Sequence, residues 1–326
     1  MLRVLSLPSV RALLALLGVF ALGLIFNADG AFYKWTTHSD MLRQVSVYGI
    51  LACGMTLVII AAGIDLSVGS VLGLNAVLFA LFTIHWGWSA AIAIPAVLLC
   101  GTACGLVSGT LIARYSLQPF IATLAMMVFA RGLAKWISGG QKISQSIQTP
   151  DGGFAYVDLP RVFEVLDQKF LGGNVSAVTL IFLVCVLVCW VALQYLKAGR
   201  YLYAIGGNET AASLSGVPVA RTKLIAYGAC GLFAAVAGIC QAVQEYQGDP
   251  EAGVAYELNA IAIVVIGGSS LMGGRGGILL TLLGTLTIGY LEKILSINAV
   301  GEPARLMLTG GIIVAAVIFQ RSGASR

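Results

Sequence analysis

One acidic residue, Asp65, interrupts the apolar run "GMTLVIIAAGIDLSVGS", which extends from Gly54 to Ser70. An ionisable group inside an apolar segment is costly, and it usually has a function or an internal partner. Four roles are open to Asp65: a cap on the following helix, a hinge or ion-pair partner of Arg275, a direct substrate ligand, or a catalytic carboxylate. A catalytic role needs a second acid or a base within reach, and neighbouring apolar segments offer no obvious one. The residues around it that loosen a helix are Gly63, Ser67 and Gly69.

Other reactive residue types give no catalytic or metal-binding pattern. All seven cysteines fall in apolar segments, and the two pairs with i,i+4 spacing are Cys100/Cys104 and Cys185/Cys189. A metal site needs more ligands, and the only histidines are His38 and His85. The phosphate-binding pattern G-x-x-x-x-G-K-[ST] is absent. We therefore expect buried, unreacted cysteines, no metal, no cofactor and no ATP site.

The composition indicates an integral membrane protein. Hydrophobic residues make up 59% of the 326 residues, charged residues only 10%, and the mean hydropathy is +0.93. A soluble domain carries about 25% charged residues, so this chain could not cover a surface in water. Forty glycines are present, and small residues let helices pack closely in lipid. The run "GTACGLVSG" places Gly101, Gly105 and Gly109 on one helix face, which predicts a packing groove.

The pattern of apolar runs predicts an all-α polytopic protein, with residues 1–326 forming a single transmembrane domain. A helix needs about 17–25 apolar residues to cross a bilayer. Some of the candidate segments are short or interrupted, so we expect broken helices among them. The ten predicted spans are 10–26, 43–63, 66–84, 89–113, 118–137, 175–196, 223–244, 257–273, 277–297 and 303–320.

Ten spans place both termini on one side of the membrane. The bias of Lys and Arg in short loops indicates that this side is the cytoplasm, and most acidic residues fall on the other face. On this topology residues 138–174 form a long external loop, in which we expect an ordered cap or a short amphipathic helix. Residues 197–222 form a long cytoplasmic loop.

The cytoplasmic loop contains the signals of one short helix. Asn208 is a good N-cap, and Glu209 places negative charge in the first turn. Gly216, followed by Pro218, is a stop signal. Such a helix could dock on a partner protein or lie at the lipid headgroups. Its small face consists of Ala211, Ala212 and Ser215.

Four segments together resemble the permease subunits of ATP-binding-cassette importers for monosaccharides, the ribose-type family. They are "GMTLVIIAAGIDLSVGSVLGL", "IATLAMMVFARGLAKWISGGQ", "GRYLYAIGGNETAASLSGVPVARTKL" and "YELNAIAIVVIGGSSLMGGRGG". The resemblance extends from about Gly54 to Leu308 and implies a permease fold like that of type II importers. It implies two permease copies around a pore, a cytoplasmic ATPase and an external sugar-binding protein. The helix from Asn208 to Ser215 would then be the coupling helix that docks on the ATPase.

The late motif "IGGSSLMGGRGG" is similar in character to the segment around Asp65. Broken helices that line a cavity are a common device in transporters. We therefore predict a second helix break or hinge here, at Gly267, Gly268, Gly273, Gly274 and Arg275.

The sugar pathway is harder to locate, because a hydroxyl-rich substrate needs only scattered polar groups. Each candidate is also a candidate for a helix-packing hydrogen bond in lipid. External acids such as Glu251 and Asp158 would either pair with the binding protein or simply be solvated. The candidate pathway residues are Asn75, Thr123, Gln241, Gln244, Asn259 and Ser269.

Other functions compete with sugar import. A permease for nucleosides or branched-chain amino acids is the closest rival, and a stand-alone secondary carrier is a second. An intramembrane enzyme is disfavoured because no catalytic constellation is evident. The resemblance places choice of sugar mainly in the separate binding protein, so the chain itself does not identify it.

Overall fold

The computed structural model describes residues 8–148, 151, 153–301, 303–305, 307–308 and 310–311. Within them, eight helical segments are long and apolar enough to cross a membrane. This confirms the all-α membrane class. The eight are α2 (Pro8–Ile25), α3 (Trp35–Ile60), α4 (Val68–Ala80) continued by the π-helix η2 (Leu81–His85), α5 (Ala90–Tyr115), α6 (Pro119–Ser138), α8 (Ala177–Tyr195), α11 (Val219–Glu245) and α13 (Ile278–Ile297).

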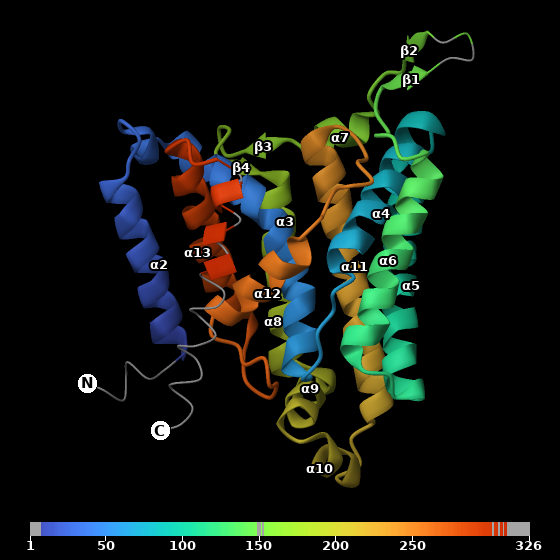
Figure 1. Cartoon of the computed structure of the whole chain (residues 1–326), viewed down its shortest axis with the longest axis vertical. Helices are drawn as coiled ribbons and strands as arrows, with labels where there is room; N and C mark the ends of the chain where they lie inside the picture. Colours follow the sequence, from blue (N-terminus) through green and yellow to red (C-terminus); the bar gives the residue numbers. More distant parts are fainter. Residues whose placement is uncertain are drawn as a thin grey trace.

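Short elements occupy the two ends of the bundle (Figure 1). Helices α9 (Lys197–Gly207) and α10 (Glu209–Leu214) lie at the end where α2 begins. Antiparallel pairs β1 (Ser146–Gln148) with β2 (Phe154–Tyr156), and β3 (Lys169–Phe170) with β4 (Val175–Ser176), lie at the opposite end with α7 (Arg161–Leu166). The remaining elements are the 3₁₀ turn η1 (Ala31–Tyr33) and α12 (Tyr256–Ile266).

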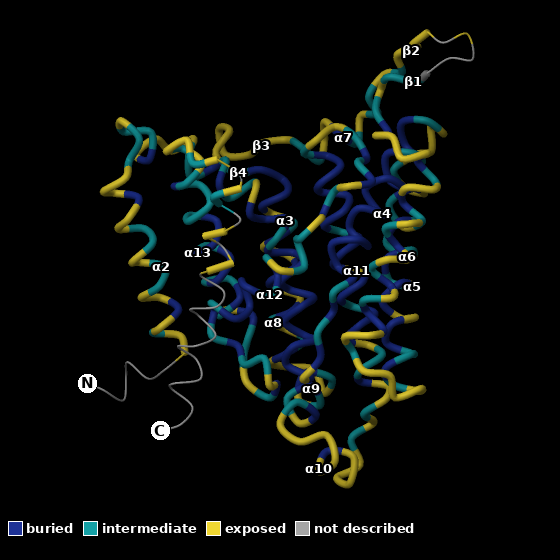
Figure 2. Tube along the Cα trace, viewed as in Figure 1, coloured by how far each residue is buried: buried dark blue, intermediate teal, exposed yellow. Residues whose placement is uncertain are grey.

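Helix α11 forms the centre of the bundle and packs against α3, α4 and α5. Figure 2 shows the buried residues concentrated along α3 and α11, with exposed residues on α2, α10 and the β1–β2 hairpin. The groove predicted on α5 is present. A Cβ added at Gly105 would lie 2.9 Å from the backbone carbon of Tyr227, and one at Gly231 would lie 2.9 Å from the backbone nitrogen of Gly105. The backbones of α5 and α11 are therefore in direct contact.

Two segments of non-helical backbone enter the bundle from opposite ends (Figure 1). Residues 61–67 lead from the α9 end of α3 back to the start of α4, and residues 246–255 lead from the other end of α11 to α12. The segments meet where α4 begins, because a Cβ on either Gly69 or Gly253 would collide with the carbonyl oxygen of the other. The bundle thus contains two broken helices of opposite direction, an arrangement typical of transporters.

Two of the ten predicted spans differ from the structure or lie outside it. The prediction for 257–273 was wrong as a full span, because α12 has only 11 residues and ends at Ile266, before a glycine-rich loop. The predicted span 303–320 lies largely outside the described residues, so the count of ten is not confirmed. The cytoplasmic loop also differs, because residues 197–207 form helix α9 rather than a loop.

The close contact of α5 and α11 generates a stability prediction. We expect Gly231→Leu to destabilise the purified protein, because the added side chain has no room between two backbones; overpacking costs about 1–3 kcal/mol. Gly132→Leu on α6 is the control, since a Cβ there meets nothing within 4 Å. Thermal unfolding in detergent measures both. Equal melting temperatures for the two variants would contradict the packing account.

Candidate functional site

The short helix α10 is built as its sequence suggests. The side chain of Asn208 accepts a hydrogen bond from the Ala211 amide at 2.9 Å, and Gly216 follows the helix with a φ of 81°. The Glu209 carboxylate accepts hydrogen bonds of 2.7 Å from the Lys223 ammonium group at the start of α11. These contacts hold α10 in one orientation at the end of the bundle.

The exposed face of α10 includes only part of the face that the sequence indicated. Ala212 is buried, with 5% exposure, so it packs inward and is not available to a partner. Ala211 and Ser215 are exposed, and Leu214 projects into solvent with 86% exposure. A hollow of about 300 Å³ adjoins the helix, between the start of α11 and the connection from α5 to α6. Leu214 is therefore the largest apolar group that α10 offers to a partner.

Helix α9 connects α10 to the end of α3 and to the glycine loop between α12 and α13. The Gly206 backbone lies so close to Ile60 and Gly274 that any side chain on Gly206 would collide with them. The Gly274 amide donates to the Ile60 carbonyl at 2.9 Å, and the Tyr203 hydroxyl donates to the Gly276 carbonyl at 3.0 Å. The end of α3, the glycine loop and α9 thus form one three-way junction directly next to α10.

Asp65 lies in the first non-helical segment and is 1% exposed. Its carboxylate accepts hydrogen bonds from the amide of Ser67 at 2.9 Å and from the hydroxyl of Ser67 at 2.6 Å. Both donors come directly before α4, so the carboxylate secures the start of that helix. Asp65 and Arg275 do not form an ion pair, although the structure describes both residues.

The second glycine motif forms the loop between α12 and α13. The Ser270 amide donates to the Arg275 carbonyl at 2.9 Å, which closes a tight turn. Gly273 and Gly274 have φ angles of 83° and 67°, a conformation that favours glycine. Gly267 and Gly268 end α12, where Gly267 approaches the backbone of Leu280. The motif therefore allows a sharp reversal with three backbones in close contact.

Arg131 is an important residue that the sequence analysis missed. It lies within α6, and its guanidinium group donates to the carbonyls of Pro250 at 2.5 Å and Ala252 at 2.8 Å. It thereby satisfies backbone oxygens of the second non-helical segment inside the bundle. The signal was present in the sequence, since Arg131 is a charged residue inside an otherwise apolar predicted span.

The structure separates the six candidate pathway residues. Asn75 and Thr123 are fully buried and bond to carbonyls of their own helices, those of Val71 and Pro119. Ser269 is buried in the glycine loop at the α9 end. Gln241, Gln244 and Asn259 lie on α11 and α12. The structure therefore does not bring all six together.

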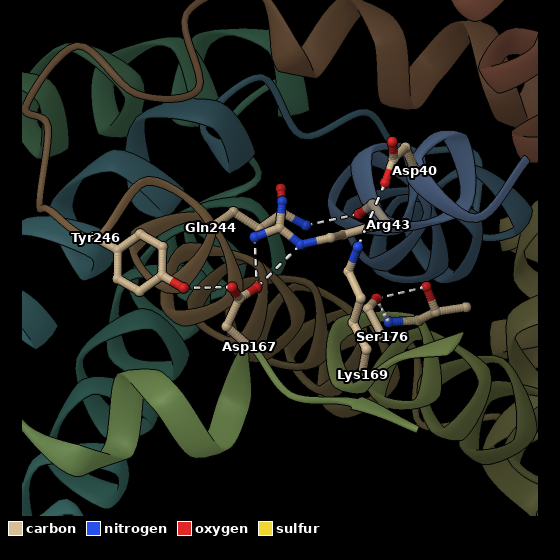
Figure 3. Close-up of polar contacts among 8 residues, drawn as sticks. Asp40, Arg43, Asp167, Lys169, Ser176, Gln244 and Tyr246 are labelled. Atoms are coloured by element: carbon tan, nitrogen blue, oxygen red, sulfur yellow. Dashed lines mark hydrogen bonds and ion pairs between the residues drawn. The ribbon is translucent and has the colours of Figure 1, made fainter. Parts of the chain in front are cut away.

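A polar network joins three elements at the end of the bundle opposite α9 (Figure 3). The Asp167 carboxylate accepts hydrogen bonds from Arg43 of α3, at 2.5 and 3.0 Å, and from the Tyr246 hydroxyl at 2.5 Å. The hydrogen bond from Tyr246 raises the pKa of that tyrosine. Gln244 of α11 donates to the Arg43 carbonyl at 2.7 Å. This Asp167 network links the cap that contains α7 to both central helices, and a weaker Lys169–Asp40 pair at 3.7 Å lies beside it.

Comparison with known proteins identifies the fold described above. Residues 38–317 match the family described as "Branched-chain amino acid transport system / permease component". The chain belongs to this permease family. No solved structure matches the permease.

Curated relatives cover nearly the whole permease. A ribose import permease protein of Bacillus subtilis (strain 168) is 39% identical over 307 residues, which are 94% of this chain and 91% of that protein. One of Escherichia coli (strain K12) is 36% identical over 308 residues, 94% and 92% of the two chains. A fructose import permease protein of Rhizobium meliloti is 34% identical over 316 residues, 96% and 84%.

The Asp167 network generates a second prediction. Asp167→Ala leaves Arg43 and Tyr246 without their shared acceptor, so we expect the melting temperature of the purified permease to fall. Asp40→Ala is the matched control: its side chain is 48% exposed, and exposed ion pairs contribute about 0–1 kcal/mol. If both variants unfold at the wild-type temperature, Asp167 does not hold the cap to the bundle.

Proposed function

We propose that the permease is the membrane subunit of an ATP-driven importer that carries a monosaccharide across the cytoplasmic membrane. The observation that carries this proposal is the match to ribose import permeases over 94% of the chain. A fructose import permease matches over a similar length, which supports the sugar class more than any one sugar. The permease is not itself the ATPase, so a separate cytoplasmic ATPase subunit supplies the energy.

In this proposal the end that carries α9 and α10 faces the cytoplasm, and both termini lie on that side. The residues assigned to coupling remain Asn208, Glu209, Ala211, Ser215 and Gly216, with Leu214 in place of the buried Ala212. ATPase movement would pass through α9 to the three-way junction, where Ile60 ends α3 and Gly274 lies in the loop between α12 and α13. Two permease copies, identical or related, form the pore, and an external binding protein delivers the sugar to the opposite end.

A second candidate substrate is a branched-chain amino acid, because the family description names that class. Import of nucleosides and transport as a stand-alone secondary carrier are two further candidate functions. The identity of the substrate taken up distinguishes the three importers, and uptake without an ATPase would indicate the secondary carrier.

Whole-cell uptake tests the function directly. We expect affinity-tagged permease to copurify with an ATPase subunit, and cells to take up one of labelled ribose, fructose or xylose. Deletion of the copurified ATPase gene should reduce that uptake to background, because the permease has no nucleotide site. Uptake that persists after the deletion would rule out the ATP-driven importer, and ATPase-dependent uptake of labelled leucine alone would favour an amino-acid permease.

Docking through α10 has its own test. We expect Leu214→Asp to abolish copurification of the ATPase and to reduce uptake at least tenfold, because a buried, unpaired charge is costly in an interface. Leu171→Asp is the matched control, since Leu171 is 76% exposed at the opposite end of the permease. Retention of the ATPase by the Leu214 variant would show that α10 is not the docking element.

A further inference from the structure

A group of polar side chains surrounds the contact between Tyr48 and Tyr256, well away from α10. Tyr48 lies at the centre of α3, about 20 Å from either end at 1.5 Å per residue. Tyr256 is the first residue of α12, directly after the second non-helical segment. Their ring centroids are 4.4 Å apart, with the planes inclined at 52°. Two aromatic rings therefore meet at mid-length of α3, one of the helices long enough to cross a membrane.

Amide and carboxylate groups from three helices face these rings. Asn259 of α12 interacts with the Tyr48 hydroxyl, and Gln241 of α11 interacts with that of Tyr256. Gln241 also donates to the Glu245 carboxylate at 2.5 Å. Glu292 of α13 lies close enough to both tyrosines and to Arg305 to interact with them electrostatically. We call Tyr48, Gln241, Tyr256, Asn259 and Glu292 the central polar cluster.

The central polar cluster is not sealed in the core of the chain. Tyr48, Tyr256, Asn259 and Glu292 are each only partly buried, and the nearby Glu245 is exposed. Carboxylates and amides at membrane depth avoid lipid and face the interior of a bundle or a water-filled path. By contrast, the open faces of α5 and α6 present apolar groups such as Leu99 and Phe129. The cluster therefore faces the bundle interior or a water-filled path rather than lipid.

We propose that the central polar cluster is a monosaccharide-contact site on the translocation path, an inference that rests on the proposed function. Amides donate and accept hydrogen bonds with hydroxyl groups, carboxylates accept them, and aromatic rings present apolar faces to the C–H faces of a sugar ring. The carboxylate of Glu292 and that of the neighbouring Glu245 can therefore accept hydrogen bonds from sugar hydroxyls. Because α12 begins at this site, movement of α12 would change the contacts during transport.

The test compares a sugar with its own deoxy derivatives. Chromosomal Tyr48→Phe and Asn259→Leu variants remove one hydrogen-bonding group each and keep the side-chain volume similar. We expect each to lower the initial uptake rate of the labelled sugar about threefold to tenfold, the range of one neutral hydrogen bond. Thr102→Val on α5 is the control, because it also removes one hydroxyl from a span, and that hydroxyl bonds only to the Leu98 carbonyl of its own helix.

The decisive readout is discrimination, which a merely structural defect does not change. The labelled mono-deoxy derivatives chosen are those that the purified binding protein binds as tightly as the parent sugar, so that any remaining discrimination arises in the permease. We expect at least one derivative that wild-type cells take up more slowly than the parent sugar to be taken up at the parent rate by the Tyr48→Phe or Asn259→Leu variant. Unchanged discrimination in both variants overturns the site, even if their uptake is slower. Absence of ATPase-dependent sugar uptake in the wild type overturns the proposed function instead.

Discussion

Every polar group of the backbone must find a partner inside a lipid bilayer, and the two non-helical segments of this permease exist only because that requirement is met. In the first segment, the Gly63 amide bonds to the Val58 carbonyl, and Asp65 accepts from Ser67. In the second, Arg131 donates to two carbonyls, and the Gly248 amide donates to the Ile143 carbonyl of the cap. Asp65 and Arg131 are thus charged residues whose side chains hydrogen-bond to backbone groups of the two segments.

This requirement also explains why the segments are connected to distant parts of the chain. The partners of the first segment lie at the α9 end, where Ile60 accepts from Gly274. The partners of the second lie at the opposite end of the bundle, with Ile143 and the cap that Asp167 holds in place. Each non-helical segment has its bonding partners at the end of the bundle from which it enters. The two segments meet where Gly69 contacts Gly253. A displacement of α9 can therefore reach both α4 and α12 through backbone contacts alone.

The sequence predicted the local features and missed those that depend on tertiary contacts. Asn208 and Gly216 carry their own capping and stop signals, so α10 could be placed within a residue. Hydropathy extended α12 to residue 273, because apolar content does not reveal that the chain reverses after Gly267. Helix α9 was missed because glycines at both ends mask a pattern whose buried residues, Leu202 and Ile205, appear only once α9 packs on α8 and α11.

The candidate site shows the same division. Asn75, Thr123 and Ser269 were sensible candidates by residue type, but their burial could be known only from the packing around them. The search for uncharged polar residues also passed over Tyr48, since a tyrosine in an apolar span is indistinguishable from a packing residue by sequence. Its importance comes from Tyr256, which is more than 200 positions away in the chain.

The central polar cluster and the Asp167 network differ in how far their polar groups are already bonded. Asp167 accepts three hydrogen bonds and its side chain is only 17% exposed, so its charge is fully satisfied within the fold. In the cluster, Tyr48, Asn259 and Glu292 remain partly open, so their groups can exchange a neighbouring side chain for a ligand. A substrate must bind well enough to enter a membrane path and weakly enough to leave it. Single, exchangeable hydrogen bonds to hydroxyls satisfy both conditions, whereas a fully desolvated charge pair would satisfy only the first.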